Sequence, residues 1–415
     1  MAVLKTIPID LLRPGMYVAR FDLSWFKHPF LSTRLGMLKD HKLPAYLRSL
    51  GVTHVEIDLD RGLDVDLGPL PAPPPEPPQA PEELEEPAAP FVFTTQDIPP
   101  PTDSARTLRF AKRFFSQSMD CTKRVMAGAQ TGKPVALDEA RLIIGRLIAT
   151  VESNRSVVRL LSVLKAYDEY TYTHCLNVAA MGVLFGKHIG LSGNQLETLG
   201  LAGLLHDVGK CLLPSEIVNK PGKLTDDEFE VMKKHTVLGF DYIKDQPGVP
   251  APVALGVLEH HERQDGTGYP RQIAGREIAG VSRILSVLDV YDALTSDRVY
   301  RARMSPHLAL RTLCAKRGSA FPEAILDRFI ACVGVYPPGS VVQLRNGFFA
   351  VVTGYDERSP LHPSMTIFLG RDGRPVNPRR VETLRLRDQP TGSGYEIARH
   401  VEPSEVAPPD ASFWR

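Results

Sequence analysis

Two short motifs of this chain combine histidine with an acidic residue. The first is His206-Asp207-Val208-Gly209-Lys210, and the second, further along, is His260-His261-Glu262. Neutral imidazoles and carboxylates together bind divalent first-row metal ions. Such ions lower the pKa of bound water enough to supply hydroxide near neutral pH. The two motifs therefore predict a hydrolytic metal centre.

The candidate ligands fall in segments whose apolar composition is typical of buried helices. They are His174, His206, Asp207, His235, His260, His261 and Asp289. A buried polar group costs free energy unless it is paired, and a shared metal site satisfies all of them together. A core histidine that bonds a backbone carbonyl is the alternative for any single residue, but it does not explain the whole set.

The geometry of a helix suggests how these ligands divide. His206 and Asp207 end the apolar run Leu196–Leu205, so their side chains leave the helix about a hundred degrees apart and can reach one metal cluster. His260 and His261 are adjacent, and neighbouring side chains on a helix diverge, so we expect them to serve two ions. Two ions about 3.5–4 Å apart, bridged by Asp207 and a hydroxide, suit in-line displacement at phosphorus.

A lysine and a glycine-rich loop lie near these ligands. Lys210 comes three residues after Asp207, and on a continuing helix it would reach a phosphate oxygen or the departing hydroxyl. In the loop Asp265–Pro270 the glycines permit positive φ, and the proline favours an extended Tyr269. The alternatives are a solvated lysine near a helix end and an ordinary turn.

Two arginines follow the candidate ligand Asp289 by nine and twelve residues, at Arg298 and Arg301. The planar donor fork of arginine fits phosphate oxygens and guanine edges. Pairing with surface carboxylates is the alternative. The neighbouring motifs favour a substrate-binding role.

Composition and charge limit the class of protein. The chain has 415 residues. A domain with a single hydrophobic core is usually smaller than this, so we expect two or three domains. Hydrophobic residues make up 43% and charged residues 23% of the chain, as in a globular protein rather than a fibre or a membrane span. The formal net charge of +1 disfavours binding to a nucleic-acid polymer.

Cysteine usage and the lack of targeting signals favour the cytoplasm. The five cysteines are scattered without metal-finger spacing, so we expect reduced thiols. The residues after Met1 do not resemble a signal peptide, and no apolar run approaches the ~20 residues that span a bilayer. We therefore expect a cytoplasmic protein without a membrane span.

Changes of pattern along the chain define six regions. Residues 68–103 contain about a third of the 36 prolines and too little apolar surface to fold. Residues 40–50 have the pattern of one amphipathic helix. We predict a small α+β N-terminal domain over 1–67, a disordered Pro/Glu-rich linker over 68–103, connecting helices over 104–160, a metal-dependent helical domain over 161–337, a small β appendage over 338–390 and a flexible tail over 391–415.

Local signals place several element boundaries. Thr225–Glu228 has the capping-box pattern and is expected to open a helix that carries His235. Ser305-Pro306 is expected to open another helix. In the last region the period of the pattern changes to two, and Asn346-Gly347 and Asp372-Gly373 favour tight hairpins between strands.

The motifs, their order and their spacing resemble those of the HD-GYP family. The resemblance is carried by His206–Lys210, His260–Glu262, Asp265–Pro270 and Ser282–Arg301, within a region from about Ala166 to Val333. The first sixty residues are similar to the uncharacterised domain that often precedes HD-GYP modules in bacteria, at Leu12–Val18, Trp25 and His28–Phe30. The resemblance implies a mainly α protein with an all-helical HD-domain-type bundle, besides the small N-terminal α+β domain and the short C-terminal β appendage.

The resemblance also implies an activity and a set of site residues. HD-GYP proteins are metal-dependent phosphodiesterases that open the bacterial second messenger cyclic di-GMP to pGpG and sometimes continue to GMP. The implied mechanism is attack by a metal-bridging hydroxide, with Asp207 and Lys210 as catalytic residues. The implied metal ligands are His174, His206, Asp207, His235, His260, His261 and Asp289. Residues implied to bind the nucleotide or shape its site are Lys210, Arg298, Arg301, Gly268, Tyr269 and Pro270.

One departure from the family pattern bears on the number of metal ions. Some members have a glutamate four residues before the first histidine ligand, where it helps to hold a third metal. In this chain that position is Tyr170, and Glu169 lies off the His174 face of a helix. We therefore expect two divalent ions, iron or manganese on family grounds, with zinc, nickel, cobalt and magnesium as alternatives.

Other interpretations stay open at this point. The module could hydrolyse another nucleotide, such as a cyclic GMP-AMP dinucleotide or a nucleoside polyphosphate, although the GYP loop argues against the latter. It could also be a catalytically silent cyclic di-GMP sensor or interaction module. Protein partners would bind the GYP loop or the N-terminal domain, and a homodimer is compatible with the sequence.

Overall fold

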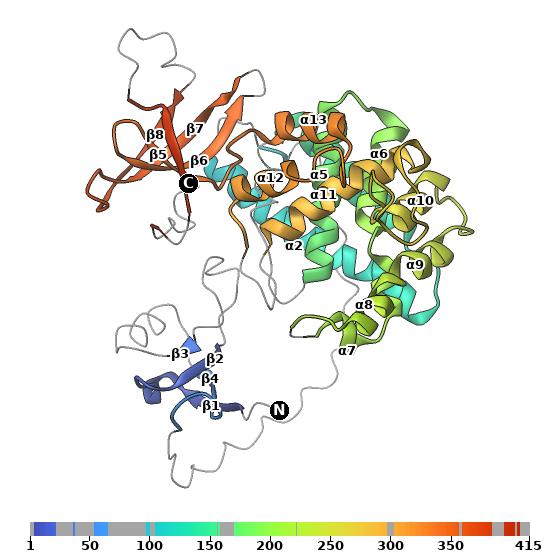
Figure 1. The fold of residues 1–415 in the computed structure, drawn as a ribbon, viewed down its shortest axis with the longest axis horizontal. Coiled ribbons are helices and arrows are strands. Elements are labelled where there is room, and N and C mark those ends of the chain that lie inside the picture. The colour runs from blue at the N-terminus through green and yellow to red at the C-terminus, as the bar shows by residue number, and fades with distance from the viewer. Residues whose placement is uncertain are drawn as a thin grey trace. The chain divides into compact units, whose positions relative to one another are not determined.

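The computed structural model describes residues 4–21, 36–37, 54–64, 97–99, 104–155, 157, 170–220, 222–296, 303–356, 359–383, 394–402 and 405–406. The chain divides into two compact units, Met1–Val92 and Phe93–Arg415. Strands form the first unit, and the second contains a bundle of helices followed by a separate sheet (Figure 1).

The first unit is built on an antiparallel sheet of four strands in the order β1-β4-β2-β3. The strands are β1 (Leu4–Pro8), β2 (Tyr17–Phe21), β3 (Gly36–Met37) and β4 (His54–Asp58), and the 3-10 helix η1 (Ile9–Leu11) follows β1. Apolar side chains of β1, η1, β2 and β4 form its core. The strand part of the expected small α+β N-terminal domain is confirmed. The helix expected over 40–50, Trp25 and His28–Phe30 lie outside the described residues.

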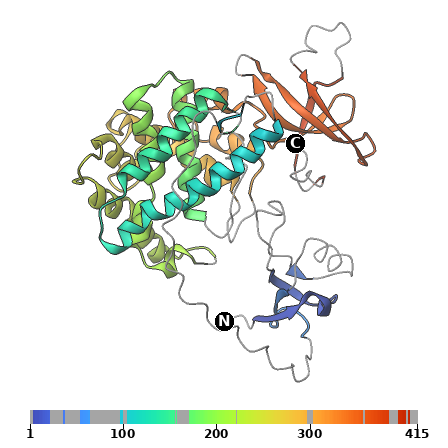
Figure 2. The same cartoon turned by 180° about the vertical axis from the view of Figure 1, so that it is seen from behind.

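The second unit begins with a bundle of helices, which confirms the mainly α fold class (Figure 1). In chain order they are α2 (Ser104–Thr131), α3 (Leu137–Ser153), α5 (Tyr170–His188), α6 (Gly193–Leu205), η3 (Val208–Leu212), α7 (Ser215–Val218), α8 (Asp226–Lys233), α9 (His235–Ile243), α10 (Ala251–Glu259), η4 (Gly275–Glu277), α11 (Gly280–Thr295), α12 (Pro306–Cys314) and α13 (Glu323–Val333). Seen from behind, the long helix α2 runs along the face of the bundle (Figure 2). Among the described residues, no helix is both long and apolar enough to cross a membrane.

Helices α5 and α6 form the centre of the bundle. Residues 173–186 of α5 are all buried, and so are residues 199–205 of α6. A helix that is apolar on all sides belongs in a core rather than at a surface. The predicted apolar run is this helix α6, and His206 is its C-cap residue. The first motif therefore starts where a core helix ends.

Two glycines let the elements that carry the candidate ligands approach closely. A Cβ on Gly203 of α6 would lie 2.8 Å from the Cα of Ala179 in α5. A Cβ on Gly209 of η3 would lie 1.9 Å from the carbonyl oxygen of His235 and 2.6 Å from the backbone nitrogen of Gly239. Real Cβ atoms do not approach other atoms so closely. The glycine of the first motif is therefore required for the contact between η3 and α9.

An antiparallel sheet of five strands follows the helices in the order β8-β7-β6-β5-β9. Its strands are β5 (Val341–Leu344), β6 (Phe349–Asp356), β7 (Ser359–Leu369), β8 (Pro375–Glu382) and β9 (Ile397–Val401). Gly347, between β5 and β6, has φ of 87°, and Gly373, between β7 and β8, has φ of 75°. Both predicted hairpins are confirmed, and each has its glycine in the left-handed region that tight turns use.

The structure differs from the expected C-terminal tail at one point. The sequence predicted a flexible tail over 391–415, but Ile397–Val401 forms strand β9 and pairs with β5. Val401 is the one buried residue of this strand, and the other four are partly or fully exposed. An edge strand of this kind lacks the alternation of apolar and polar residues that identifies strands in a sequence.

Substituting Gly209 by alanine should force η3 away from α9. Because overpacking a tight contact costs about 1–3 kcal/mol, we expect Gly209→Ala to lower the free energy of unfolding by at least that amount in urea denaturation. The matched control is Gly145→Ala, since a Cβ on Gly145 of α3 would meet no heavy atom within 4 Å. That variant should gain about 0.5–1 kcal/mol from helix propensity. Similar effects of the two substitutions would contradict this account of the contact.

Candidate metal centre

Asp207 is shared by two groups of possible metal ligands. One group is Asp207, His174 and His206, and the other is Asp207, His235, His260 and His261. Within each group the ligand atoms all lie within 4.8 Å of one another, and every side chain except His261 is buried. The fold thus brings six of the seven predicted ligands together around one carboxylate.

The two carboxylate oxygens of Asp207 face different groups. Oδ2 lies 3.3 Å from Nε2 of His206 and 3.7 Å from Nε2 of His174. Oδ1 lies 3.4 Å from Nε2 of His235 and 3.9 Å from Nε2 of His260. Among the described residues, Oδ1 has no hydrogen-bond partner although it is buried. A buried and unpaired carboxylate oxygen is costly, so this atom is suited to bind a cation.

Three of the histidines are oriented by carbonyl groups at helix ends. His206 and His260 are the C-cap residues of α6 and α10, and His235 comes directly after the C-cap residue of α8. The Nδ1 of each ring donates to the carbonyl three residues earlier, at Gly203 (2.8 Å), Val257 (2.9 Å) and Met232 (2.7 Å). The last carbonyls of a helix have no partner inside the helix. Each imidazole therefore satisfies one of them and is held in place by it.

The same hydrogen bond explains where a predicted helix stops. The capping box at Thr225 and Glu228 is confirmed, but α8 ends two residues before His235, which begins α9 instead. In an uninterrupted helix the carbonyl of Met232 would accept the N–H four residues later. Here it accepts the Nδ1–H of His235. The side chain thus takes over a bond that would have continued the helix.

In the second group the lone pairs of two imidazoles face each other. Burial lowers the pKa of His235 to about 4 and that of His260 to about 3, so both rings are neutral near pH 7. Because a carbonyl only accepts, Nδ1 of each ring carries the proton and Nε2 carries the lone pair. The two Nε2 atoms are 3.3 Å apart. A cation between such lone pairs replaces repulsion by coordination, so this donor set fits a divalent metal ion.

In the first group His174 is held by two carboxylates. Its Nδ1 lies 2.8 Å from Oδ2 of Asp292, and its Nε2 lies 3.1 Å from Oδ1 of Asp289. Burial lowers the pKa of His174, but hydrogen bonds to Asp289 and Asp292 and their charges outweigh it and raise the pKa to about 9. Its Nε2 is 3.2 Å from Nε2 of His206. A carboxylate behind an imidazole orients the ring and makes it a better metal ligand.

Asp292 was not assigned a role from the sequence, although it orients a candidate ligand. Its Oδ2 accepts the Nδ1–H of His174 and, at 3.1 Å, the hydroxyl of Ser296. Asp289 and Asp292 are both buried in α11 and lie three residues apart, which places them on one face of the helix. This spacing of two carboxylates in an otherwise apolar helix is the sequence feature that could have identified Asp292.

Asp289, the seventh predicted ligand, lies outside both groups but contacts a member of each. Its Oδ1 is 3.1 Å from Nε2 of His174, and its Oδ2 is 3.6 Å from Nδ1 of His261. Burial raises the pKa of Asp289, but the hydrogen bond from His174 and the charges of nearby histidines hold it well below its ordinary value. For Asp207, burial is likewise outweighed by the charges of Lys210 and His206. The side chains of Asp207 and Asp289 are therefore both ionised at neutral pH.

His260 and His261 belong to the same group, whereas we expected them to serve two ions. That expectation assumed that both residues lie within a helix, where neighbouring side chains diverge. Helix α10 ends at Glu259, so the pair lies on the turn that follows. The centroids of the two rings are only 4.1 Å apart. The turn makes the two side chains converge.

Lys210 contacts the carboxylate of Asp207. Its Nζ donates to Oδ2 at 2.6 Å. The predicted continuing helix is absent here, because α6 ends before Asp207 and Lys210 lies in the 3-10 helix η3. Side chains three residues apart nearly eclipse each other in a 3-10 helix, so the contact still forms. The Lys210 side chain is 21% exposed, which places its ammonium group at the border with solvent.

The loop that follows the second motif packs against the second group. The ring centroid of Tyr269 lies 4.7 Å from that of His261. A Cβ on Gly268 would lie 2.4 Å from the Cα of Glu262, so glycine is needed there for a close approach of two backbone segments. The Tyr269–Pro270 peptide bond is cis. Of the three loop residues predicted to shape the site, Tyr269 contacts a candidate ligand directly.

Two buried glutamates hold the segment that follows this loop, and neither was assigned a role from the sequence. Oε1 of Glu262 accepts the backbone N–H groups of Arg271 at 2.6 Å and Gln272 at 3.1 Å. Glu259 accepts from the guanidinium group of Arg271 and, at 2.8 Å, from the backbone N–H of Ala279. Glutamate is rarely fully buried unless it is paired. Glu259 could have been identified from the sequence because it is the one charged residue in α10.

Four positions named from the sequence cannot be placed. Arg298, Arg301 and Glu169 lie outside the described residues, and so does the side chain of Tyr170. The nucleotide contacts of the two arginines therefore stay predictions. The expectation of two metal ions rather than three also stays a prediction.

Two family descriptions match the chain. Residues 156–325 match the HD domain, and residues 4–140 match a domain of unknown function (DUF3391). The first range contains both groups of candidate ligands, and the second contains the N-terminal sheet and helix α2.

Several curated proteins are similar to this chain. The cyclic di-GMP phosphodiesterase PA4108 of Pseudomonas aeruginosa is 34% identical over 386 residues, which cover 92% of this chain and 89% of that protein. The cyclic di-GMP phosphodiesterase response regulator RpfG of Xanthomonas campestris pv. campestris is 34% identical over 193 residues, 46% of this chain and 51% of that one. The 3'3'-cGAMP-specific phosphodiesterase 1 of Vibrio cholerae is 37% identical over 156 residues, 37% of this chain and 36% of that one. Among solved structures, Bd1817, an HDG"Y"P protein from Bdellovibrio bacteriovorus, covers 79% of this chain and 98% of its own with a TM-score of 0.47 and 14% identity.

Replacing Asp207 by asparagine should lower the metal content of the protein below that of the wild type. The amide keeps one acceptor oxygen but replaces the other by an NH2 group that cannot bind a cation, so the two groups no longer share a carboxylate. Elemental analysis of anaerobically purified protein measures the content. His188→Gln, at the end of α5 and outside both groups, is the control and should keep the wild-type content. A wild-type content in Asp207→Asn would refute the shared role of this carboxylate.

Proposed function

The chain belongs to the HD-GYP family, and from that premise we propose that it hydrolyses cyclic di-GMP to pGpG at the centre around Asp207. Family membership rests on the relative that matches nearly the whole chain and on the HD domain. The named relatives that support this substrate include proteins from several bacteria. A further step from pGpG to GMP belongs to the same proposal.

One observation carries the proposal: a single buried carboxylate joins two groups of imidazoles. A structural metal site needs one closed set of ligands. Two sets that share a carboxylate instead suit a pair of ions that act together on the attacking and leaving oxygens of a phosphodiester. The net charge of +1 gives no long-range attraction to a nucleic-acid polymer, which favours a small phosphodiester as the substrate.

The residues of the centre would have distinct roles in binding metal and in positioning the ligands. His174 and His206 would hold one divalent ion, and His235, His260 and His261 would hold the other, with Asp207 common to both. When bound, such ions polarise phosphoryl oxygens and lower the pKa of water towards about 7. The helix-end carbonyls and Asp292 keep the imidazoles in position before substrate arrives. Little reorganisation is then needed during the reaction. On family grounds we propose iron or manganese as the metal.

Lys210 would contribute positive charge at the edge of the centre. Its ammonium group holds Oδ2 of Asp207 at 2.6 Å and is partly exposed to solvent. From there it would stabilise negative charge on a phosphoryl oxygen or on the departing 3′ oxygen. Lys210 thus has two roles in the proposal, one on the carboxylate and one on the substrate.

A cyclic GMP-AMP dinucleotide is a second candidate substrate. Two relatives from Vibrio cholerae are named as 3'3'-cGAMP-specific phosphodiesterases. The metal centre would act on the phosphate, so it does not distinguish guanine from adenine. Base preference must come from side chains around the centre, among which Arg298 and Arg301 are candidates. Binding without turnover is disfavoured because all seven expected ligands are present in the sequence.

The other parts of the chain are assigned to regulation in this proposal. The N-terminal domain over 1–67 would receive a signal, and the linker over 68–103 would connect it to the catalytic domain over 161–337. Protein partners would bind the N-terminal domain or the GYP loop. The protein would act in the cytoplasm, as a monomer or a homodimer. These assignments follow from the sequence pattern.

Replacing both His206 and Asp207 by alanine should abolish hydrolysis of cyclic di-GMP. Bound metal supplies several kcal/mol to such reactions, and about 1.4 kcal/mol corresponds to a factor of ten in rate. We therefore expect a loss of at least about 10³-fold, measured by anion-exchange chromatography of the products. A panel that includes 3'3'-cGAMP identifies the preferred substrate. Cleavage of cyclic di-GMP by the double variant at the wild-type rate would refute the proposed centre.

Replacing Lys210 by methionine should separate its two roles. Loss of one charged group that stabilises developing charge lowers kcat by about 10²–10³-fold. Both metal ions should remain bound, because methionine removes no ligand. The measurement combines steady-state kinetics with elemental analysis. If Lys210→Met instead loses metal in proportion to activity, Lys210 acts only by holding Asp207.

A further inference from the structure

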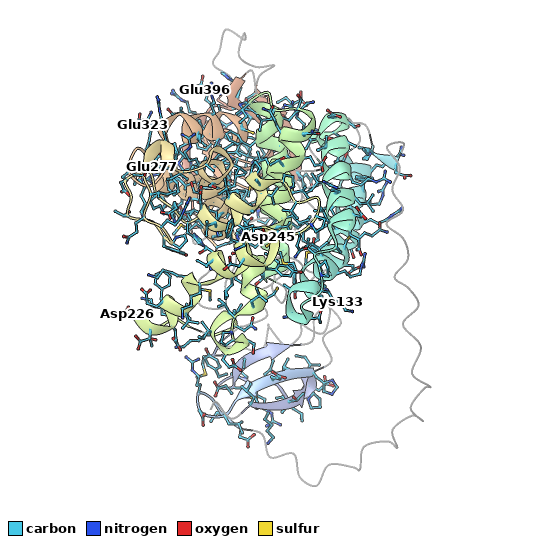
Figure 3. All side chains as sticks on the ribbon, turned by 90° about the vertical axis from the view of Figure 1, so that its right-hand side faces the viewer. Lys133, Asp226, Asp245, Glu277, Glu323 and Glu396 are labelled. Carbon is cyan, nitrogen blue, oxygen red and sulfur yellow. The ribbon has the colours of Figure 1, made fainter. Side chains whose placement is uncertain are left out.

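A large aromatic side chain is exposed near the second group of ligands. Phe229 of helix α8 is 46% exposed. Helix α8 lies at the rim of the helical unit, where its first residue, Asp226, points outward (Figure 3). Tyr269 and Lys233 contact part of this ring, and the exposed remainder is available to a planar ligand.

Phe229 is connected to the metal centre by a row of rings. Its ring centroid lies 6.2 Å from that of Tyr269, with an angle of 83° between the planes. Tyr269 in turn lies 4.7 Å from His261, with an angle of 33°. The three rings therefore lead from a candidate metal ligand to the surface. A molecule whose phosphate lies at the ligands could place a planar group on Phe229.

A cation accompanies this row of rings. Nζ of Lys233 lies 5.5 Å from the ring centroid of Phe229 and 5.8 Å from that of Tyr269. Phe229 and Lys233 are four residues apart in α8, so they share one face of the helix. Lys233 also pairs with Glu230, which is 66% exposed. An ammonium group in this position can donate to the O6 and N7 acceptors of a guanine.

Helix α8 is held firmly enough to serve as a platform. Its capping box joins the Thr225 hydroxyl to the N–H of Glu228 at 3.3 Å and the Glu228 carboxylate to the N–H of Thr225 at 2.7 Å. The same carboxylate accepts from Nζ of Lys220 at 2.5 Å. Fixing the first turn of this short helix also fixes Phe229, which comes directly after the capping box.

We propose that Phe229, Tyr269 and Lys233 form a subsite that binds one guanine base of the cyclic dinucleotide. The inference rests on the proposed function, because it takes the scissile phosphate to lie at the Asp207 centre. Phe229 stacks on the base, Lys233 donates to its O6 and N7 edge, and Tyr269 separates the base from His261. The subsite is continuous with the metal centre, which favours a part of the substrate over a protein partner as its occupant.

The test compares Phe229→Leu with wild-type enzyme on two substrates. Leucine keeps an apolar side chain but removes the ring. Loss of base stacking should raise KM for cyclic di-GMP about tenfold with little change in kcat. Hydrolysis of bis(p-nitrophenyl) phosphate, which has no base, should be unchanged, as should the metal content. Phe229→Trp should restore KM. Val237→Ala, which alters a residue of α9 that is 39% exposed, is the control and should leave KM unchanged.

The outcomes separate the subsite from the proposed function. If wild-type protein cleaves bis(p-nitrophenyl) phosphate but not cyclic di-GMP, the proposed function fails and the guanine subsite fails with it. If wild type cleaves cyclic di-GMP and Phe229→Leu has the same KM, the function stands and the subsite is overturned. An equal loss of activity on both substrates in Phe229→Leu also overturns the subsite, because Phe229 would then support the metal centre rather than bind a base.

Discussion

The centre depends on one electrostatic constraint: lone pairs and negative charge are concentrated where water is excluded. Nε2 of His235 and Nε2 of His260 face each other at 3.3 Å, and the buried Oδ1 of Asp207 lies beside them without a hydrogen-bond donor among the described residues. Such an arrangement costs free energy unless positive charge is present. Divalent cations supply that charge, and the rest of the bundle is built to hold the donors in place for them.

The fold meets this constraint with two simple devices. Helix ends provide unpaired carbonyls, and these orient three of the imidazoles so that each Nε2 is directed away from its own helix. Glycines then let the elements approach until the imidazoles converge, most clearly where Gly209 meets α9. The first device determines the tautomer of these three imidazoles, and the second lets the elements that carry the ligands approach each other closely. Both devices are located within helices or at their ends.

Much of this organisation was predictable from residue types and spacing. The apolar run before His206 and the two hairpin dipeptides each have a strong local cause, and each indicated the correct element. The histidine and aspartate motifs contain candidate ligands of both groups. Short-range chemistry of this kind is visible in a sequence because the interacting residues are close along the chain. The N-terminal strands and the all-helical bundle followed for the same reason.

Other features depend on contacts between distant residues. The convergence of His260 and His261 follows from the end of α10 at Glu259, and an apolar pattern does not reveal the last residue of a helix. The orienting role of Asp292 appears only when α11 packs beside α5. Strand β9 forms because β5 offers a free edge to it, although its own residues alternate poorly. In each case tertiary packing supplied information that local patterns lack.

The central claim of the proposed function is that Asp207 lies between two metal ions, each bound by its own set of imidazoles. Anomalous diffraction from crystals of anaerobically purified protein, recorded above and below the absorption edge of the bound metal, tests this directly. The account predicts two anomalous peaks, one beside His174 and His206 and the other beside His235 and His260, with one oxygen of Asp207 directed at each. A single peak, or peaks that Asp207 does not contact, would contradict it.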